Sequence, residues 1–390
     1  MKNIGKFLTM RERPLAWAQL SHQKTRMAVA MGGIAFANVL IFMQLGFVNL
    51  FAGGATVLPE NLRGNLFVMN PESKYISANT FDRTLLYQAA AFEGIVSAEP
   101  LYIGIGNWAY NKEQISYNTR VFAYNPKIKI FDLPEVNRQQ LNLSEPFTFL
   151  FDRLSRPELG PIPEQIETKS SASAFLNNRQ VSVRGLFSLG SSFFLGDGNV
   201  VTSDSTYAEI FGTAALNNVA VGIIHVRPGT DLVALKQGIQ KHVPGLEALT
   251  YKELKEKELK YQDENPTSVI FGFGAAMGFV VGVAIVYQVL YSDVSDHLSE
   301  YATLKAIGYS GRSLLLVIFQ EAALLAVLGY IPGFIATIGM YRLLTVLTRL
   351  ELLMQWDLAL SVFLLTLLMC LLSAAIASNK LHSADPADVF

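Results

Sequence analysis

SDHLSEYATLKAIGYSGR, residues 295–312, is a short polar segment between two long apolar runs of the chain. In a helical projection Val294, Leu298 and Tyr301 fall on one arc, and the hydroxyl and acidic side chains fall on the other. Gly308 then supplies a helix stop, because glycine tolerates the left-handed conformation that ends a helix. The pattern predicts an amphipathic helix at a membrane face, with a solvated connector between two spans as the alternative.

The composition is typical of a membrane protein with a large aqueous part. Of the 390 residues 51% are hydrophobic and 16% are charged, and the mean hydropathy is +0.30. Four apolar runs are each long enough to cross the ~30 Å hydrocarbon core of a bilayer. They are residues 27–52, 267–292, 313–346 and 358–378. The third contains Pro332-Gly333, and we expect one kinked helix there because neither half alone could cross.

The N-terminal segment sets the orientation. Residues 1–26 carry six Lys and Arg side chains and one acidic side chain, Glu12. The positive-inside rule places this basic segment, which ends in an amphipathic entry helix, in the cytoplasm. Four spans return the tail, residues 379–390, to the same side. The segment 293–312 then lies on the cytoplasmic face.

Residues 53–266 form a domain outside the membrane, since no run within them could cross a bilayer. Short β-type runs bounded by turn residues alternate with two helical patches, Thr80–Phe92 and Asp231–His242. The β-type runs are Asn65–Met69, Tyr102–Ile105, Ile115–Tyr124, Val181–Leu186 and Val219–Val226. The predicted fold class is an α-helical membrane protein with four transmembrane helices plus an α+β extracytoplasmic domain inserted between the first and second helices.

Two segments of this domain lack a clear pattern. Arg153–Ser173 is rich in Pro, Glu and Ser and is expected to be an exposed loop or a subdomain boundary. Phe193, Phe194 and Leu195 lie between glycines and serines. They are interpreted as a buried hairpin, with a hydrophobic loop that touches a partner or a lipid as the alternative.

Residues 249–265 end the domain with a segment that is polar on nearly every side, YKELKEKELKYQDE over Tyr251–Glu264. Its Glu and Lys residues fall three and four positions apart, which supports a solvated helix. We predict a stalk, not packed in a core, that continues into the second span and is broken or bent only at Asn265-Pro266; an ordinary surface helix is the alternative. The stalk residues singled out are Tyr251, Leu254, Leu259 and Tyr261.

Several residues inside the spans stand out. Asn38 and Gln44 are interpreted as helix–helix hydrogen-bonding groups, with a substrate contact as the alternative. Glu321 lies about eight residues, on the order of 12 Å, into the third span, where a carboxylate needs a partner, a proton or a bundle-facing position. We favour packing near the inner leaflet over proton chemistry. Gly274, Gly278 and Gly282 recur at four-residue spacing and predict close helix packing, in a dimer or within the bundle.

Other classes of protein find no support in the sequence. No G-x-x-x-x-G-K-[ST] loop occurs, so any ATP that drives the chain is expected on another polypeptide. The five histidines lack the spacing of metal ligands, no catalytic motif of a hydrolase is present, and the single cysteine, Cys370, cannot form a disulfide within the chain. A net charge of −1 makes nucleic acid an unsuitable partner. The chain is therefore predicted to be no enzyme, with no catalytic, cofactor or metal residues.

Three stretches carry a family resemblance. EYATLKAIGYS, Glu300–Ser310, resembles the cytoplasmic helix of MacB-type and FtsX-like permeases, the membrane subunits of ABC systems. Pro14–Phe47 is similar to the opening of the DevC-type permeases of the same superfamily, and the final residues, LHSADPADVF, resemble the usual family ending.

The resemblance implies a homodimeric permease subunit of an ABC exporter in the inner membrane. ATP-Mg would bind a separate cytoplasmic ATPase, docked on this helix. The residues expected to contact the ATPase are Leu298, Glu300, Tyr301, Leu304, Lys305, Ile307 and Gly308. Movement of the stalks would push cargo, a lipid or glycolipid, outward through a periplasmic membrane-fusion adaptor and an outer-membrane channel. The alternatives are an FtsX-like mechanotransmitter that activates an extracytoplasmic hydrolase without transport, and a lipoprotein-releasing permease.

Overall fold

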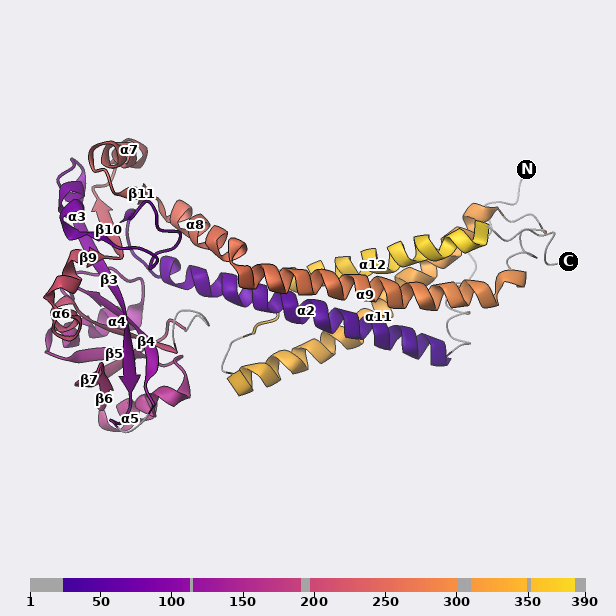
Figure 1. Cartoon of the computed structure of the whole chain (residues 1–390), viewed down its shortest axis with the longest axis horizontal. Helices are drawn as coiled ribbons and strands as arrows, with labels where there is room; N and C mark the ends of the chain where they lie inside the picture. The colour runs from indigo at the N-terminus through magenta and orange to yellow at the C-terminus, as the bar shows by residue number, and fades with distance from the viewer. Residues whose placement is uncertain are drawn as a thin grey trace. The chain divides into compact units, whose positions relative to one another are not determined.

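The computed structural model describes residues 24–112, 115–190, 197–300, 303, 307, 310–348 and 352–382. The chain divides into two compact units (Figure 1). The transmembrane unit combines the residues up to Leu50 with those from Pro266 onward, and the extramembrane unit is Phe51–Asn265. Residues 1–23 with most of the predicted entry helix, the Phe193–Leu195 loop and residues 383–390 of the tail lie outside the described residues.

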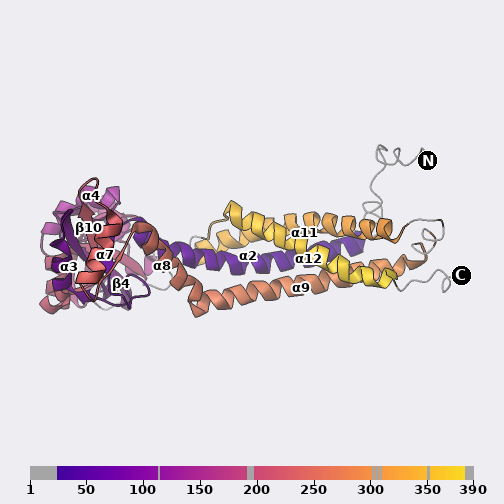
Figure 2. The ribbon, with the colours of Figure 1, turned by 90° about the horizontal axis from the view of Figure 1, so that it is seen from above.

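Four helices in the described part of the chain are long and apolar enough to cross a membrane, which confirms the predicted fold class. They are α2 (Lys24–Glu60), α9 (Pro266–Asp296), α11 (Gly311–Thr348) and α12 (Trp356–His382). Each is longer than the apolar run that predicted it, because polar turns at the ends continue the helix beyond the hydrocarbon-length run. Figure 2 shows the four lying side by side in the transmembrane unit.

The predicted bounds need correction at two places. The first helix was expected to end at residue 52, yet α2 continues to Glu60 and its last ten residues belong to the extramembrane unit. The second was expected to end at residue 292, yet α9 continues through Asp296. The third span is one helix with Pro332 inside it. This agrees with the expectation of a single helix, because neither half alone is long enough to cross a bilayer.

The extramembrane unit is built on a mixed nine-stranded sheet in the order β11-β1-β10-β3-β4-β8-β5-β7-β6. Because β6 also pairs with β3, the strands from β3 to β6 close on themselves. The strands are β1 (Leu66–Met69), β3 (Ile95–Ala109), β4 (Tyr117–Tyr124), β5 (Thr148–Asp152), β6 (Ala172–Leu176), β7 (Arg179–Phe187), β8 (Gly198–Ser203), β10 (Val221–Val226) and β11 (Glu247–Leu249), and a separate pair joins β2 (Phe81–Asp82) to β9 (Asn218–Val219).

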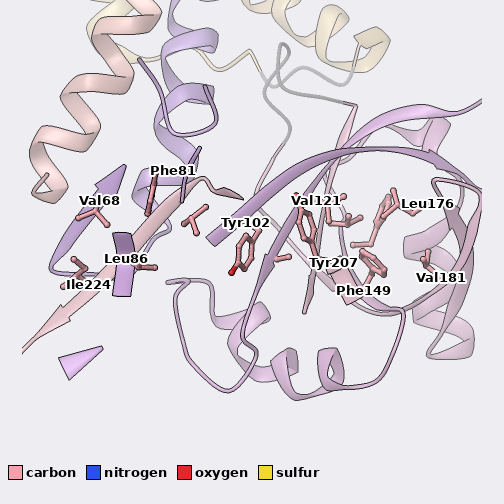
Figure 3. Close-up of a cluster of buried hydrophobic side chains, with 14 of the residues drawn as sticks. Val68, Phe81, Leu86, Tyr102, Val121, Phe149, Leu176, Val181, Tyr207 and Ile224 are labelled. Atoms are coloured by element: carbon pink, nitrogen blue, oxygen red, sulfur yellow. The ribbon is translucent and has the colours of Figure 1, made fainter. Parts of the chain in front are cut away.

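Both faces of the sheet are covered, so its strands are apolar at successive positions. In β4, Val121 and Ala123 enter one core cluster, and Phe122 and Tyr124 enter the cluster on the opposite face. Figure 3 shows the first cluster, in which Tyr102, Tyr207 and Val121 are drawn. Covering by helices therefore explains why short continuous apolar runs, rather than alternating ones, marked these strands.

Helices flank the sheet. They are α3 (Arg83–Ala90), α4 (Pro134–Gln139), α5 (Ile162–Lys169), α6 (Asp204–Phe211), α7 (Leu232–His242) and α8 (Tyr251–Glu264), with 3-10 turns η2 (Gln140–Ser144), η3 (Pro157–Leu159) and η4 (Thr213–Asn217). The expected loop at Arg153–Ser173 is wrong, since η3 and α5 occupy it and bury Leu159 and Ile162. The Leu159 carbonyl accepts a hydrogen bond from the indole of Trp108 at 3.0 Å. Long-range packing thus overrides a loop-like composition.

Candidate functional site

The segment between α9 and α11 is described only in part. Residues 298–300 are helical, with Leu298 half-buried and Glu300 exposed, and the Glu300 amide donates to the His297 carbonyl at 3.1 Å. Ile307 is 73% exposed and its amide donates to the Thr303 carbonyl at 3.0 Å. The other residues expected to contact an ATPase, Tyr301, Leu304, Lys305 and Gly308, lie outside the described residues. Ile307 is therefore an apolar side chain open to a partner in this unit.

A charged cluster lies where α9 ends. Arg26, near the start of α2, donates to Asp293 at 3.2 Å and to the Ser292 hydroxyl at 3.1 Å, and it also pairs with Asp296. The Asp293 side chain is only 7% exposed, whereas the Asp296 side chain is 55% exposed. One guanidinium therefore ties the beginning of α2 to the last turns of α9.

Glu321 of α11 is buried in the same unit. It is 3% exposed, and its Oε2 atom receives no hydrogen bond from the described residues. The sequence predicted that Glu321 would need a partner, a proton or a bundle-facing position. It did not indicate which residues would lie near Glu321. Asp293 was missed because it was assigned to the aqueous connecting segment. The signal that could have found it is the helical continuation of Tyr291–Asp296 beyond the apolar run.

The three spaced glycines contact helices of the same unit. A methyl group on Gly278 would meet Ile41 of α2 at 3.2 Å, and one on Gly282 would overlap the Met369 sulfur of α12 and meet Ala37 of α2 at 3.0 Å. Gly274 lies against the Gln44 amide. The small residues thus let α9 approach α2 closely, which assigns them to packing within the bundle.

Asn38 occupies the buried seam between α2 and α12. Its side-chain oxygen accepts a hydrogen bond from the Thr366 hydroxyl at 2.7 Å, and the residue is fully buried. This contact is a helix–helix hydrogen bond of the kind expected from the sequence. Gln44 is half-buried and fills the space left by Gly274 on α9.

The segment predicted as a stalk is a helix that is interrupted at Asn265-Pro266, as expected, but the prediction that it is not packed in a core is wrong. One face of α8 buries Leu254, Glu258 and Gln262, and Leu254 enters the core cluster below the sheet. Tyr261 packs on Tyr75 with ring centroids 4.5 Å apart. Leu259 is half-buried and Tyr251 is 41% exposed. The prediction failed because two of the three buried side chains are polar. A polar helix face is interpreted as exposed to solvent when the residues that cover it are distant in the sequence.

Salt bridges reinforce the position of α8. Its Lys and Glu side chains pair with three other segments of the extramembrane unit: Glu253 with Lys236, Lys257 with Glu247, and Lys255 with Glu60. The helix starts with a capping box. The Thr250 side chain accepts a hydrogen bond from the Glu253 amide, and the Glu253 carboxylate accepts one from the Thr250 amide. After Glu264 the chain leaves the helical conformation at Asn265, with ψ of 130°, and α9 begins at Pro266.

Glu258 is the buried carboxyl of α8. It accepts a hydrogen bond from the Ile76 amide at 2.6 Å. Burial raises the pKa of Glu258 to about 7, against the opposing influence of that hydrogen bond and of the positive charge on Arg120. Arg120, itself buried, donates to Asn199 at 2.9 Å, and Asn199 donates to Asp152 at 2.8 Å. Sequence reasoning identified none of this buried network, since its members come from four separate elements.

Among the described residues no group of three or more His, Cys, Asp or Glu side chains is arranged to hold a metal ion. The features of these units are a cluster of charged side chains at the end of α9, an exposed apolar residue in the following segment, and, within the extramembrane unit, a helix α8 that is packed and held by salt bridges. They define a polytopic membrane protein whose contacts serve helix packing and the attachment of α8.

Comparison with known proteins agrees with this class. Residues 272–386 match the family model described as FtsX-like permease C-terminal, which spans most of α9 together with α11 and α12. This match confirms the family resemblance read in the connecting segment and shows an FtsX-like permease domain over residues 272–386. No curated protein matches the chain. The closer kinship to the DevC type stays a prediction.

Three solved structures are each similar to about half of the chain. The extracellular domain of the noncanonic ABC-type transporter YknZ from Gram-positive bacteria has 11% identity, a TM-score of 0.34, and covers 47% of this chain and 99% of its own. The periplasmic region of MacB from Actinobacillus actinomycetemcomitans has 10% identity and a TM-score of 0.34, and the match covers 50% of this chain and 92% of the MacB chain. A domain of a permease protein from Porphyromonas gingivalis has 13% identity and a TM-score of 0.30, and the match covers 47% of this chain and 85% of the permease chain.

Proposed function

We propose that this chain is the transmembrane subunit of a MacB-type ABC exporter that works by mechanotransmission. In this proposal a separate cytoplasmic ATPase binds ATP-Mg and docks on the segment between α9 and α11, and the chain itself catalyses nothing. The observation that carries the proposal is the FtsX-like match over residues 272–386, because it includes most of α9 and all of α11, the two helices that flank this segment.

The packing inside the extramembrane unit supports transmission of force. Leu58, in the last turns of α2, and Leu254 of α8 belong to the same buried cluster below the sheet. Lys255 of α8 also pairs with Glu60 at the end of α2. Since both segments that lead out of the domain are fixed to it, a displacement of either would be passed to the sheet.

The remaining partners follow from the family resemblance. We place the chain in the inner membrane with both termini in the cytoplasm, as a homodimer that works with a periplasmic membrane-fusion adaptor and an outer-membrane channel. A lipid or glycolipid is the proposed cargo, by kinship with the DevC type.

Copurification tests the proposal. The full chain, tagged and extracted in a mild detergent from its native host, should bring down an ABC ATPase and an adaptor, and mass spectrometry should find a bound lipid. Recovery of a cell-wall hydrolase without an adaptor would replace the exporter by the FtsX-like mechanotransmitter, and recovery of an acylated protein would favour a lipoprotein-releasing permease.

A further inference from the structure

The exposed side of α12 carries a row of large apolar side chains, one at every fourth position. They are each between 42% and 59% exposed, and they are Leu360, Leu364, Leu368, Leu372 and Ile376. The opposite side of α12 is buried in the transmembrane unit, where Val362, Thr366 and Cys370 are fully buried. Because α12 is long and apolar enough to cross a bilayer, its exposed row is suited to contact with acyl chains.

Trp356 extends this row to the first residue of α12. It lies four positions before Leu360 and is 89% exposed, more than any other large apolar side chain of the described residues. Leu353, three positions before Trp356, is also largely exposed. The same is true of Val346 and Leu347 at the end of α11. The described ends of α11 and α12 therefore both present apolar side chains.

The backbone around Trp356 is fixed to the helix bundle. Leu352 and Leu358, on either side of Trp356 in the sequence, are buried. The Gln355 side-chain oxygen accepts a hydrogen bond from the side-chain amide nitrogen of Asn49 in α2 at 3.4 Å. The neighbouring side chains thus hold this segment in place, and the indole of Trp356 is left exposed.

Asp357 and Leu360 define the depth of Trp356 in the membrane. Asp357 is exposed, and a carboxylate is costly within hydrocarbon. Leu360 lies about 6 Å further along the helix axis than Trp356. The span from Trp356 to Asn379 has 24 residues, on the order of 36 Å, which slightly exceeds the ~30 Å hydrocarbon core. The first turn of α12 is therefore expected at the boundary between headgroups and acyl chains.

An indole suits this boundary, because its ring is apolar and its N–H group can donate a hydrogen bond to water or to a headgroup. We propose that Trp356 and Leu353 form an interfacial anchor, in which both side chains insert at the headgroup–acyl boundary on the side of the membrane where α12 begins. The partner is the bilayer itself, not a second copy of the chain or the extramembrane unit. This inference does not depend on the proposed export function.

Quenching of tryptophan fluorescence by brominated lipids tests the interfacial anchor. The chain has three tryptophans, Trp17, Trp108 and Trp356. Trp108 is fully buried in the extramembrane unit, and the substitution Trp17→Phe removes the emission of Trp17. The emission of Trp356 is then the difference between the Trp17→Phe chain and the chain with both Trp17→Phe and Trp356→Phe. Both full-length chains are reconstituted in phosphatidylcholine vesicles with bromine near the headgroup end or near the methyl end of the acyl chains.

Bromine near the headgroup end should quench the Trp356 emission more strongly than bromine near the methyl end. Leu353→Trp, in the chain that lacks Trp17 and Trp356, should give the same order. Leu368→Trp in that chain is the matched control, because Leu368 lies in the middle of the exposed row, about 18 Å further along α12 than Trp356. Its tryptophan should show the opposite order. The emission of Trp108 should be the same in all vesicles.

Quenching of Trp356 by aqueous iodide without quenching by either lipid would overturn the anchor, since the indole would lie in water. Protection from iodide and from both lipids would also overturn it and would show that protein covers this side of α12. Equal or stronger quenching by bromine near the methyl end would place the indole in the hydrocarbon core, which contradicts the proposed depth. If Leu368→Trp fails to fold, the emission of Trp356 still decides among these outcomes.

Discussion

Single buried polar residues hold together elements that are far apart in the sequence. Glu258 links α8 to the loop at Ile76, and Asn38 links α2 to α12 through Thr366. Each of these contacts replaces water by one specific partner, so removing the partner leaves a buried polar group unsatisfied. The specificity of the fold therefore depends on a few side chains that look unremarkable in the linear sequence.

Glu258 should make the attachment of α8 sensitive to pH. The pKa of this group is raised from 4.5 to about 7 in the folded chain, so the folded state binds more protons than the unfolded state between those values. Its stabilising contribution is full below pH 4.5 and is lost as pH rises to about 7, by up to roughly 3 kcal/mol. Amide hydrogen exchange of α8 in the full chain should become faster over this range.

The isosteric variant Glu258→Gln keeps an acceptor for the Ile76 amide and cannot ionise. Exchange in its α8 peptides should therefore lack this pH-dependent loss of protection, once the intrinsic effect of pH on exchange is subtracted. Glu209→Gln, an exposed carboxyl on α6, serves as the control and should behave as the wild type. Equal slopes in the wild type and Glu258→Gln would contradict the assignment.

Helices α2, α9 and α11 are brought together by small residues at their contact lines. Gly333 of α11 lies so close to α2 that an added methyl group would approach the Ala35 carbonyl oxygen to 3.0 Å and Asn38 to 3.0 Å. Backbone atoms of a helix cannot move aside as a flexible side chain can. The closeness of the helices thus requires glycine at this position.

Gly333→Ala should lower the stability of the transmembrane unit by about 1–3 kcal/mol, because the methyl group has no space. Gly339→Ala, on the same helix with nothing within 4 Å of the added methyl group, should be neutral or slightly stabilising. The two variants are compared by thermal unfolding in detergent, in which the reaction of the buried Cys370 thiol with a thiol reagent reports unfolding. An equal loss in both variants would show that helix propensity, not space, decides.

The packed face of α8 leads to a second prediction at the level of the element. Leu254 is fully buried in the cluster below the sheet, and Leu259 is half-buried. Leu254→Ala should cost about 2–5 kcal/mol through the cavity that it leaves, and Leu259→Ala clearly less. Limited proteolysis within residues 249–265 measures the release of the helix. A free stalk would instead give equal and small effects.

At the scale of the molecule, the proposed function requires force to enter through the segment between α9 and α11 and to reach the sheet. Ile307→Asp should abolish stimulation of the partner ATPase while expression and folding stay normal, since the side chain is 73% exposed and supports no core. The measurement is ATPase activity of the copurified complex. Val233→Asp, an exposed apolar residue on α7, is the matched control and should retain stimulation. Unchanged activity in Ile307→Asp would remove this segment from the coupling mechanism.

The sequence by itself determined the membrane-spanning class, the insertion of an α+β domain and the family of the permease segment. Runs of apolar residues report hydrocarbon length directly, and the connecting segment carries its motif in adjacent positions. Strand Leu66–Met69 and helix Leu232–His242, capped by Asp231, were likewise predictable, because their signals are local.

The tertiary structure alone decided which polar residues meet. Arg26 and Asp293 come from two helices, and Glu258 reaches a loop 182 positions away in the sequence. The burial of one face of α8, with Glu258 and Gln262 on it, was hidden for the same reason. Contacts between distant segments depend on how the helices and the sheet pack, and no periodicity within one segment records that packing.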